Sequence, residues 1–297
     1  MQTRTHAKAG ALLGILASLS LAITSAAEAG IFYDIELKGT YETNVVGLLS
    51  DNRGGSSGMS ASAGPGMSNA MGGNPNMGGH GSNYTGSSSS TSNSDTSIDL
   101  SADLGNSWSV ADDTNVFLAG SAERANYSSF TEFNATIGGL SAGVQKGFGN
   151  SILARFAVNG AVKRYGDSQR DSSAYGAVLK VKEQLGPSFW LREGYAYEKN
   201  SADSALFSYN GNGVNIWAGF LVAPQTTVLA GYNYLVRDFD EPVGFKITAQ
   251  TLSLGLEQGF TKNWFLDAQY DHQASDSNEA GTSATDNVLS LGLRYSY

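Results

Sequence analysis

Two adjacent residues, Asp271 and His272, form the pair in this chain that most resembles catalytic machinery. A carboxylate beside an imidazole can activate water, and Asp267 and Asp276 would add further carboxylates. Successive side chains of a β-strand point to opposite faces, so on a strand the two groups would be separated. His272 also lacks a serine motif that would make it the base for a nucleophile. We therefore expect an interfacial His272, no catalytic residue and no enzymatic activity.

A second candidate for chemistry is a methionine-rich segment that ends near His80. It contains every methionine after the initiator: Met59, Met67, Met71 and Met77. Thioether and imidazole groups are soft ligands, so a Cu(I) site is one interpretation of this segment. The spacing matches no metal motif, however, and methionine is tolerated in a spacer rich in Gly, Ser and Asn. We expect neither a bound metal nor another cofactor.

Charged residues recur two or four positions apart in several segments. The spaced pairs are Asp34 and Glu36, Asp99 and Asp103, Lys180 and Lys182, and Asp267 and Asp271. A strand repeats its faces every two residues, so this spacing puts both members of a pair on one face. Each pair therefore predicts a strand with one charged face.

The strands that would position these charges are predicted by alternation of apolar and polar residues. In one example, Tyr175, Ala177 and Leu179 share a face, and Lys180 and Lys182 lie on the other. Twelve segments alternate in this way, which predicts an all-β, antiparallel fold. Their ranges are 31–46, 97–105, 114–126, 134–146, 151–165, 173–185, 188–199, 213–223, 226–237, 246–259, 264–274 and 287–297.

Short and long connections alternate along the chain. Tight turns rich in Gly, Pro and Asn are expected at 147–150, 186–187, 224–225 and 261–263. Longer polar links are expected at 127–133, 166–172, 200–212, 238–245 and 275–286. Turns on one side and loops on the other are typical of β-barrels that span a membrane. The link at 106–113 fits poorly, because it falls among the turns yet is longer than they are.

The longest link, about 47–96, differs in composition from the rest of the chain. Between Gly54 and Asp95 there are 42 residues, of which 11 are Gly and 12 are Ser. Such a segment buries too little apolar surface to offset the entropy of ordering it. We expect a disordered external loop.

The amino-terminal residues have the features of a secretory signal peptide. Arg4 and Lys8 precede the uncharged run 9–23, and Ala27-Glu28-Ala29 supplies a cleavage site. We therefore expect a signal peptide at 1–29 and a mature domain at 30–297. The chain contains no cysteine, so no disulfide holds the fold.

The carboxy-terminal strand carries the pattern polar, x, Gly, x, x, aromatic, x, aromatic from Ser290 to Tyr297. Leu291, Leu293 and Tyr295 share its apolar face. This pattern resembles the assembly signal of Gram-negative outer-membrane β-barrels, with Gly292, Tyr295 and Tyr297 at its defined positions. The resemblance implies a porin-like transmembrane barrel of about 12 strands with periplasmic termini. A soluble amphipathic edge strand is the alternative.

Composition and charge agree with that resemblance. Charged residues make up only 15% of the chain, which contains 37 Gly, 14 Tyr and 13 Phe. Without the signal, 16 basic and 26 acidic residues leave a net charge of −10. This acidity argues against a nucleic-acid partner, which requires a basic surface. It suits a surface that holds divalent cations among lipopolysaccharide.

In a ring of twelve strands, the charged faces would form two opposed walls in the lumen. The basic wall would contain Arg155, Lys163, Lys180, Lys182 and Arg192. The acidic wall would contain Asp34, Glu36, Asp99, Asp103, Asp267 and Asp271. A transverse field of this kind resembles the constriction of porins. The alternative is a packed lumen in which the charges neutralise one another, since twelve strands lie between the filled barrels of about eight and the open ones of about sixteen.

These features predict a passive outer-membrane channel for small hydrophilic solutes or ions. The alternative is a non-conducting barrel that displays the 47–96 loop, or that acts as a sheath for a surface or secreted partner. The resemblance implies outer-membrane lipid, lipopolysaccharide and the barrel-assembly machinery as partners. A second copy of the chain is a further candidate, because barrel channels are often trimers.

Overall fold

The computed structural model describes residues 29–45, 94–279 and 283–297. They form twelve strands: β1 (Ala29–Glu42), β2 (Asp95–Ala111), β3 (Thr114–Tyr127), β4 (Ala135–Phe148), β5 (Ile152–Tyr165), β6 (Ser172–Gln184), β7 (Phe189–Ala202), β8 (Tyr209–Ala223), β9 (Thr226–Phe239), β10 (Lys246–Gly259), β11 (Trp264–Ser277) and β12 (Ala284–Ser296). Among the described residues, three single-turn 3-10 helices lie between strands: η2 (Thr131–Phe133), η3 (Ser168–Arg170) and η4 (Ala205–Phe207). Within the described residues, no helix is long and apolar enough to cross a membrane.

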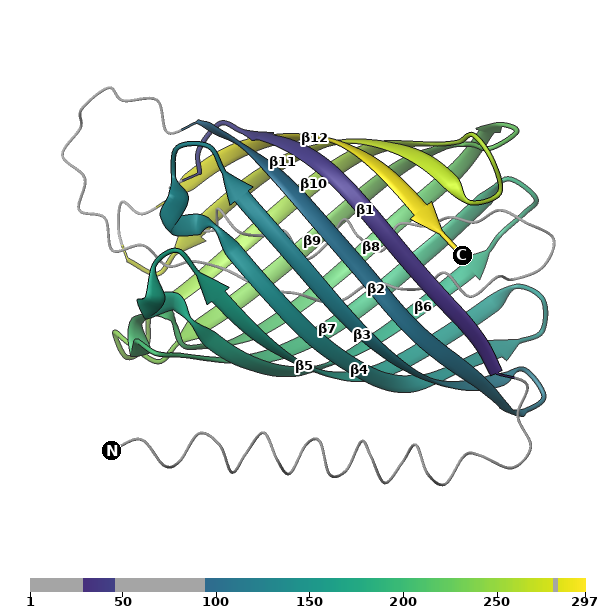
Figure 1. The fold of residues 1–297 in the computed structure, drawn as a ribbon, viewed down its shortest axis with the longest axis horizontal. Helices are drawn as coiled ribbons and strands as arrows, with labels where there is room; N and C mark the ends of the chain where they lie inside the picture. The colour runs from purple at the N-terminus through teal and green to yellow at the C-terminus, as the bar shows by residue number, and fades with distance from the viewer. Residues whose placement is uncertain (1–28, 46–93, 280–282) are drawn as a thin grey trace.

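The strands close into one antiparallel barrel, confirming the predicted fold (Figure 1). Each strand pairs with its sequence neighbours, and β1 pairs with β12 from Asp34↔Ser296 to Glu42↔Val288. Closure pairs each strand on both sides over most of its length, although Ala29 to Phe32 of β1 pair with β2 alone.

The alternation predicted from the sequence sorts side chains between the outside and the lumen. Outward-facing residues of many strands are large, apolar and exposed, including Leu37, Leu100, Leu252, Leu254, Leu291 and Phe156. The neighbours of these six residues in sequence point inward and are polar or small. Other inward positions carry large apolar side chains, such as Leu235, Ile247 and Trp217. A barrel with an apolar outer belt and a polar interior is the form in which a sheet is stable in a bilayer.

The two ends of the barrel differ in their connections. The turn end carries the tight links 112–113, 149–151, 185–188, 224–225 and 260–263, and the loop end carries η2, η3 and η4. The expectation of a long link at 106–113 was wrong, because β2 continues to Ala111 and leaves only Asp112 and Asp113 in the turn. Asp113 has a φ of 56°, and this left-handed conformation, which Asp tolerates, permits so tight a turn.

Tyrosine and tryptophan rings gather on the outside of the barrel at the turn end. Tyr33 of β1 stacks on Tyr295 and Tyr297, with ring centroids 5.7 and 5.2 Å apart. Trp264 of β11 meets Tyr295 edge-on at 5.1 Å. Amphipathic rings of this kind favour the membrane–water interface, so they form part of a girdle.

Two carboxylates organise the connections at the loop end. Asp95 accepts hydrogen bonds from the backbone N–H groups of Ser129 and Phe130, each 2.9 Å long. Asp286 accepts from the backbone N–H groups of Thr43 and Asn44 at 2.9 and 2.8 Å. These contacts fix the chain just beyond β3 and β1, which positions the entrance to the lumen.

Candidate functional site: a charged lumen

The structure directs all the predicted wall residues into the lumen. The basic ones are Arg155 and Lys163 on β5, Lys180 and Lys182 on β6, and Arg192 on β7. The acidic ones are Asp34 and Glu36 on β1, Asp99 and Asp103 on β2, and Asp267 and Asp271 on β11. In the closed ring, β6 lies across from β12 and β5 across from β11, so the two sets occupy opposite sides.

Four of the basic residues form a continuous group that we call the basic ladder: Arg155, Lys180, Lys182 and Arg192. Arg155 is the direct cross-strand partner of Lys180, and Lys182 is the partner of Arg192. Among the described residues, no carboxylate lies within ion-pair distance of Arg155, Lys180 or Lys182. Like charges directly opposite each other destabilise a sheet, so this arrangement carries a folding cost.

The basic ladder rests on aromatic rings. The guanidinium carbon of Arg155 lies 3.9 Å from the ring centre of Phe117. Lys182 Nζ lies 5.0 Å from Trp190, and the Arg192 guanidinium lies 6.0 Å from both Trp190 and Trp217. Attraction between a cation and a ring face offsets part of the repulsion within the ladder.

Glycines on neighbouring strands make room for these rings. A Cβ atom on Gly231 would lie 2.5 Å from Trp217, and one on Gly143 would meet first the Phe156 carbonyl oxygen and then the Phe117 ring at 2.7 Å. A Cβ atom on Gly219 would overlap the Trp190 ring. Each ring therefore lies against the barrel wall in the space left by a glycine.

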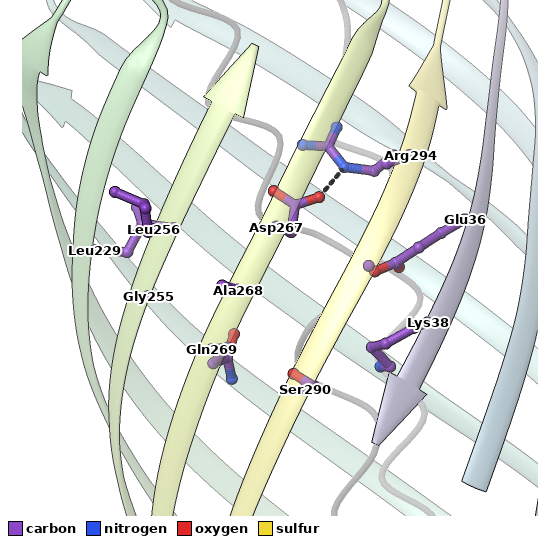
Figure 2. Close-up of a pocket in the computed structure, with 11 residues that line it drawn as sticks. Glu36, Lys38, Leu229, Gly255, Leu256, Asp267, Ala268, Gln269, Ser290 and Arg294 are labelled. Carbon is purple, nitrogen blue, oxygen red and sulfur yellow. Dashed lines mark hydrogen bonds and ion pairs between the residues drawn. The ribbon is translucent and has the colours of Figure 1, made fainter. Parts of the chain in front are cut away.

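Arg294 of β12 pairs with Asp267 of the neighbouring strand β11 (Figure 2). Its guanidinium contacts Glu257 Oε2 at 2.5 Å, Asp267 Oδ2 at 3.1 Å and Asp34 Oδ2 at 3.7 Å. We call these four residues the Arg294 cluster. Only 4% of the Arg294 side chain is exposed. Away from water, the attraction between its charge and the three carboxylates is stronger than it would be at the surface.

The glycine of the predicted assembly signal also belongs to this region. Gly292 faces the lumen beside Arg294, and a Cβ atom there would lie 2.7 Å from Glu36 Oε1. The missing side chain leaves space for the carboxylate of the first strand where the barrel closes. Tyr295 and Tyr297 stack on the outside of the same seam.

The basic ladder and the Arg294 cluster lie at the same level near the turn end. On β5, β6, β7, β10, β11 and β12, the members of both groups lie within four positions of the end of their strand that is nearest the tight turns. The strands of the two groups lie on opposite sides of the closed ring, so their charges face each other across the lumen. This part of the barrel therefore has a positive side and a negative side.

Lys163 faces the lumen as expected, but it lies eight positions from Arg155 along β5, toward the loop end. Its Nζ is 3.1 Å from Glu198 Oε1 of β7, and both side chains are almost fully buried. The Tyr209 hydroxyl donates to the same oxygen at 2.7 Å. Lys163 therefore belongs to a separate, locally neutralised group.

The two remaining acidic residues lie between these levels. Asp99 accepts a hydrogen bond of 3.3 Å from Thr40 Oγ1, and Asp271 accepts from Gln269 Nε2 at 2.7 Å. His272 points outward, as expected, with Nδ1 3.0 Å from Asn287 Oδ1. Asp271 and His272 are thus on opposite faces of β11.

Sequence reasoning missed several lumen charges: Glu198, Arg237, Glu257 and Arg294. Glu257 and Arg294 stand at alternating positions of predicted strands, so the strand phase could have identified them. Their mutual contact depends on strand register, which the sequence does not supply. The methionine-rich segment, with Met59, Met67, Met71, Met77 and His80, lies outside the described residues.

Solved structures with a similar fold are outer-membrane proteins. An outer-membrane channel from Pseudomonas putida F1 has a TM-score of 0.57 at 10% identity, covering 92% of this chain and 97% of that one. The NanC porin has a TM-score of 0.46 at 11% identity, covering 66% and 93%. An anion-selective porin from Comamonas acidovorans has a TM-score of 0.43 at 9% identity, covering 92% and 100%. No protein-family model matches the chain, and no curated protein sequence is significantly similar to it.

The chain therefore shares its fold with an outer-membrane channel. Its closed sheet, apolar outer belt and aromatic rings at the turn end are those of a barrel that spans a membrane.

Proposed function

We propose that the protein is a passive channel for small hydrophilic solutes or ions. The observation that carries this proposal is the basic ladder opposite the Arg294 cluster at one level of the lumen. Charged side chains that line a pore select among solutes, and a field across the pore orients dipolar ones. The ladder would be the selectivity filter, with Asp34, Asp103 and Asp267 on its opposite side.

Small side chains support a passage from the loop end to the ladder. Over this stretch, the lumen faces of β5 to β8 present Ala157, Asn159, Ala161, Ala174, Gly176, Gly194, Ala196, Gly211 and Gly213. On β8 to β10 the loop end of the lumen holds the large buried side chains Tyr209, Leu235, Phe239 and Ile247, so a passage would run along the small side chains of β5 to β7.

We assign the turn end to the periplasm, because outer-membrane barrels have short periplasmic turns and long external loops. Residues 1–29 would be removed as a signal peptide, and the 47–96 segment would then be external. Further partners would be lipopolysaccharide, a second copy of the chain, and the barrel-assembly machinery, which would read Gly292, Tyr295 and Tyr297. The mass of the mature protein tests the cleavage site directly.

Reversal potentials in planar bilayers, with a salt gradient across single channels, test the filter. The mature protein should give discrete conductance steps. Lys180→Glu, Lys182→Glu and Arg192→Glu together should shift ion preference toward cations, because they reverse the positive side.

The matched control reverses three cations on the outer face: Lys146→Glu, Arg164→Glu and Lys246→Glu. It changes the net charge equally and should leave the reversal potential unchanged. Equal effects of both triple variants would remove the filter assignment. A folded barrel without conductance would remove the channel and favour the display or sheath function.

A further inference from the structure

Two arginines face outward from the barrel near its loop end, on β3 and β5, with β4 between those strands (Figure 1). Arg124 is on β3 and Arg164 is on β5, and both side chains are exposed. Thr136 of β4 is the direct cross-strand partner of both. Two strand spacings, about 10 Å, separate the arginine Cα atoms, so both side chains can reach a group placed over Thr136. We call Arg124 and Arg164 the outer arginine pair.

Hydrogen bonds to neutral groups hold Arg124 against the outer surface of the sheet. Its Nε donates to Asn126 Oδ1 at 3.0 Å, and its Nη1 donates to Thr136 Oγ1 at 2.5 Å. Among the described residues, its Nη2 has no hydrogen-bond partner. The guanidinium is therefore fixed in place beside β4 and keeps a free donor.

The charge of Arg124 differs in its compensation from that of other outward cations at the loop end. Lys199 Nζ lies 3.0 Å from Asp240 Oδ1. Lys246 Nζ lies 3.1 Å from Asp238 Oδ2. Within the described part of the chain, no carboxylate lies within ion-pair distance of Arg124. A negative charge from outside the chain would compensate it.

Arg164 adds a second positive charge on the other side of Thr136. Its Nη1 donates to the Lys163 carbonyl at 3.3 Å, and its Nε lies 3.7 Å from Asp171 Oδ2. The Arg164 side chain is 60% exposed, so this loose ion pair leaves most of the guanidinium accessible. Two arginines and one carboxylate give the site a net positive charge.

The surface next to the pair, on the side toward the turn end, is apolar. Leu100 of β2 and Val162 of β5 adjoin the pair and are exposed. Between them lie Ala122 and Gly138, which are cross-strand partners, and a Cβ atom on Gly138 would meet nothing within 4 Å. A cation on the lipid-facing surface is costly at the centre of a bilayer but is tolerated near the interface, where phosphate groups attract it. The site therefore combines a cationic upper part with an apolar lower part, as a phosphorylated lipid requires.

We propose that the outer arginine pair binds a phosphate group of lipopolysaccharide, with an acyl chain lying over Ala122 and Gly138. Guanidinium and phosphate groups form charge-assisted hydrogen bonds, and two guanidinium groups can share one phosphate. The inference rests on the orientation given with the proposed function, in which the loop end is external and faces the leaflet that contains lipopolysaccharide. It does not require the barrel to conduct.

Native mass spectrometry of the full mature chain, refolded in detergent, measures bound lipid directly. Diphosphoryl lipid A, the membrane anchor of lipopolysaccharide, is the probe, and dephosphorylated lipid A with the same acyl chains is the comparison ligand. The phosphorylated form should bind about tenfold more tightly or better, because hydrogen bonds to a charged group are gained. Equal affinities for the two forms would overturn the proposal. Tighter binding of phosphatidylglycerol than of diphosphoryl lipid A would also overturn it, since a phospholipid would then be the occupant.

Variants assign the binding to the outer arginine pair. Arg124→Gln should weaken binding of diphosphoryl lipid A about tenfold, and adding Arg164→Gln should weaken it further. Glutamine keeps a donor for Thr136, and both positions are exposed, so the fold should tolerate these changes. Lys146→Gln is the matched control, because Lys146 Nζ donates to Thr114 Oγ1 at 3.2 Å on the outer face of the same two strands, β3 and β4, at the turn end. It should bind the lipid as the unaltered protein does.

The outcomes separate this site from the channel. Unchanged affinity in the double variant would overturn the site, even if the barrel conducts. An equal loss in Arg124→Gln and Lys146→Gln would overturn it as well, since any outer cation would then serve. If the double variant does not fold, Arg124→Gln decides alone. Binding that Arg124→Gln weakens and Lys146→Gln does not, in a barrel without conductance, would support the site and reject the channel.

Discussion

The two sides of the lumen differ in how their charges are compensated. On the acidic side, Arg294 brings together carboxylates of β1, β10 and β11 and so ties the seam between the first and last strands. On the basic side, Arg155 faces Lys180 and Lys182 faces Arg192 across adjacent strands. The ion pairs on the acidic side stabilise the fold. The facing cations on the basic side do not, which is why we propose that the basic ladder is the selectivity filter.

The two sides of the lumen also differ in what their glycines make room for. Beside the ladder, Phe117, Trp190 and Trp217 lie in spaces left by glycines and support cations from behind. Beside Arg294, whose guanidinium also lies 4.6 Å from the ring centre of Phe265, Gly292 makes room for a carboxylate. Glycine thus makes room for an aromatic ring beside a cation on the basic side, and for a carboxylate at the seam between β1 and β12 on the acidic side.

The largest effect is expected from Arg294→Met, which removes the cation shared by three carboxylates. Breaking a buried ion pair by deleting one partner costs about 3–5 kcal/mol in free energy of unfolding. Urea titration of the refolded barrel, followed by tryptophan fluorescence, measures that loss. Arg124→Met, on the outer surface, is the control. A loss no larger than in the control would mean that the cluster does not stabilise the seam.

Gly219→Ala should have an intermediate effect, because its Cβ would overlap the Trp190 ring. Overpacking costs about 1–3 kcal/mol, and a displaced ring should move toward the lumen and lower the single-channel conductance. Gly39→Ala is the matched control, since a Cβ there meets nothing within 4 Å. Unchanged stability and conductance in Gly219→Ala would show that the ring has room to spare.

The smallest effect, and one of opposite sign, is expected from Lys180→Met. Removing one of two facing like charges should raise the free energy of unfolding by about 0.2–1 kcal/mol. The same variant should lower the relative permeability to anions, which reversal potentials report. Lys146→Met, on the outer face, should change neither quantity. A loss of stability in Lys180→Met would show that the ladder is compensated after all.

The strands and their faces could be predicted from the sequence because alternation is a local property. The twelve segments, the inward phase of Lys180 and Lys182, and the outward phase of His272 all follow from period two. Strand ends were harder to predict. At 106–111 the residues Asn106, Ser107 and Ser109 have the composition of a loop, yet pairing with β3 keeps them extended.

The lumen site could be predicted only in part, for a similar reason. Alternation shows that Arg155 and Lys163 share a face of β5. It does not show that Glu198 neutralises Lys163, or that Arg155 belongs to the basic ladder. That distinction depends on which residues of β5, β6 and β7 lie side by side. Register is set by the whole closed sheet and not by any one strand.

The sequence by itself determined that this chain folds as an antiparallel β-barrel and which charged residues face inward, because alternation and turn chemistry are local properties of a few residues. The tertiary structure alone decided which charges are compensated and that aromatic rings support the ladder. Those features join strands that are distant in sequence, and a contact between distant residues is fixed only when the barrel closes.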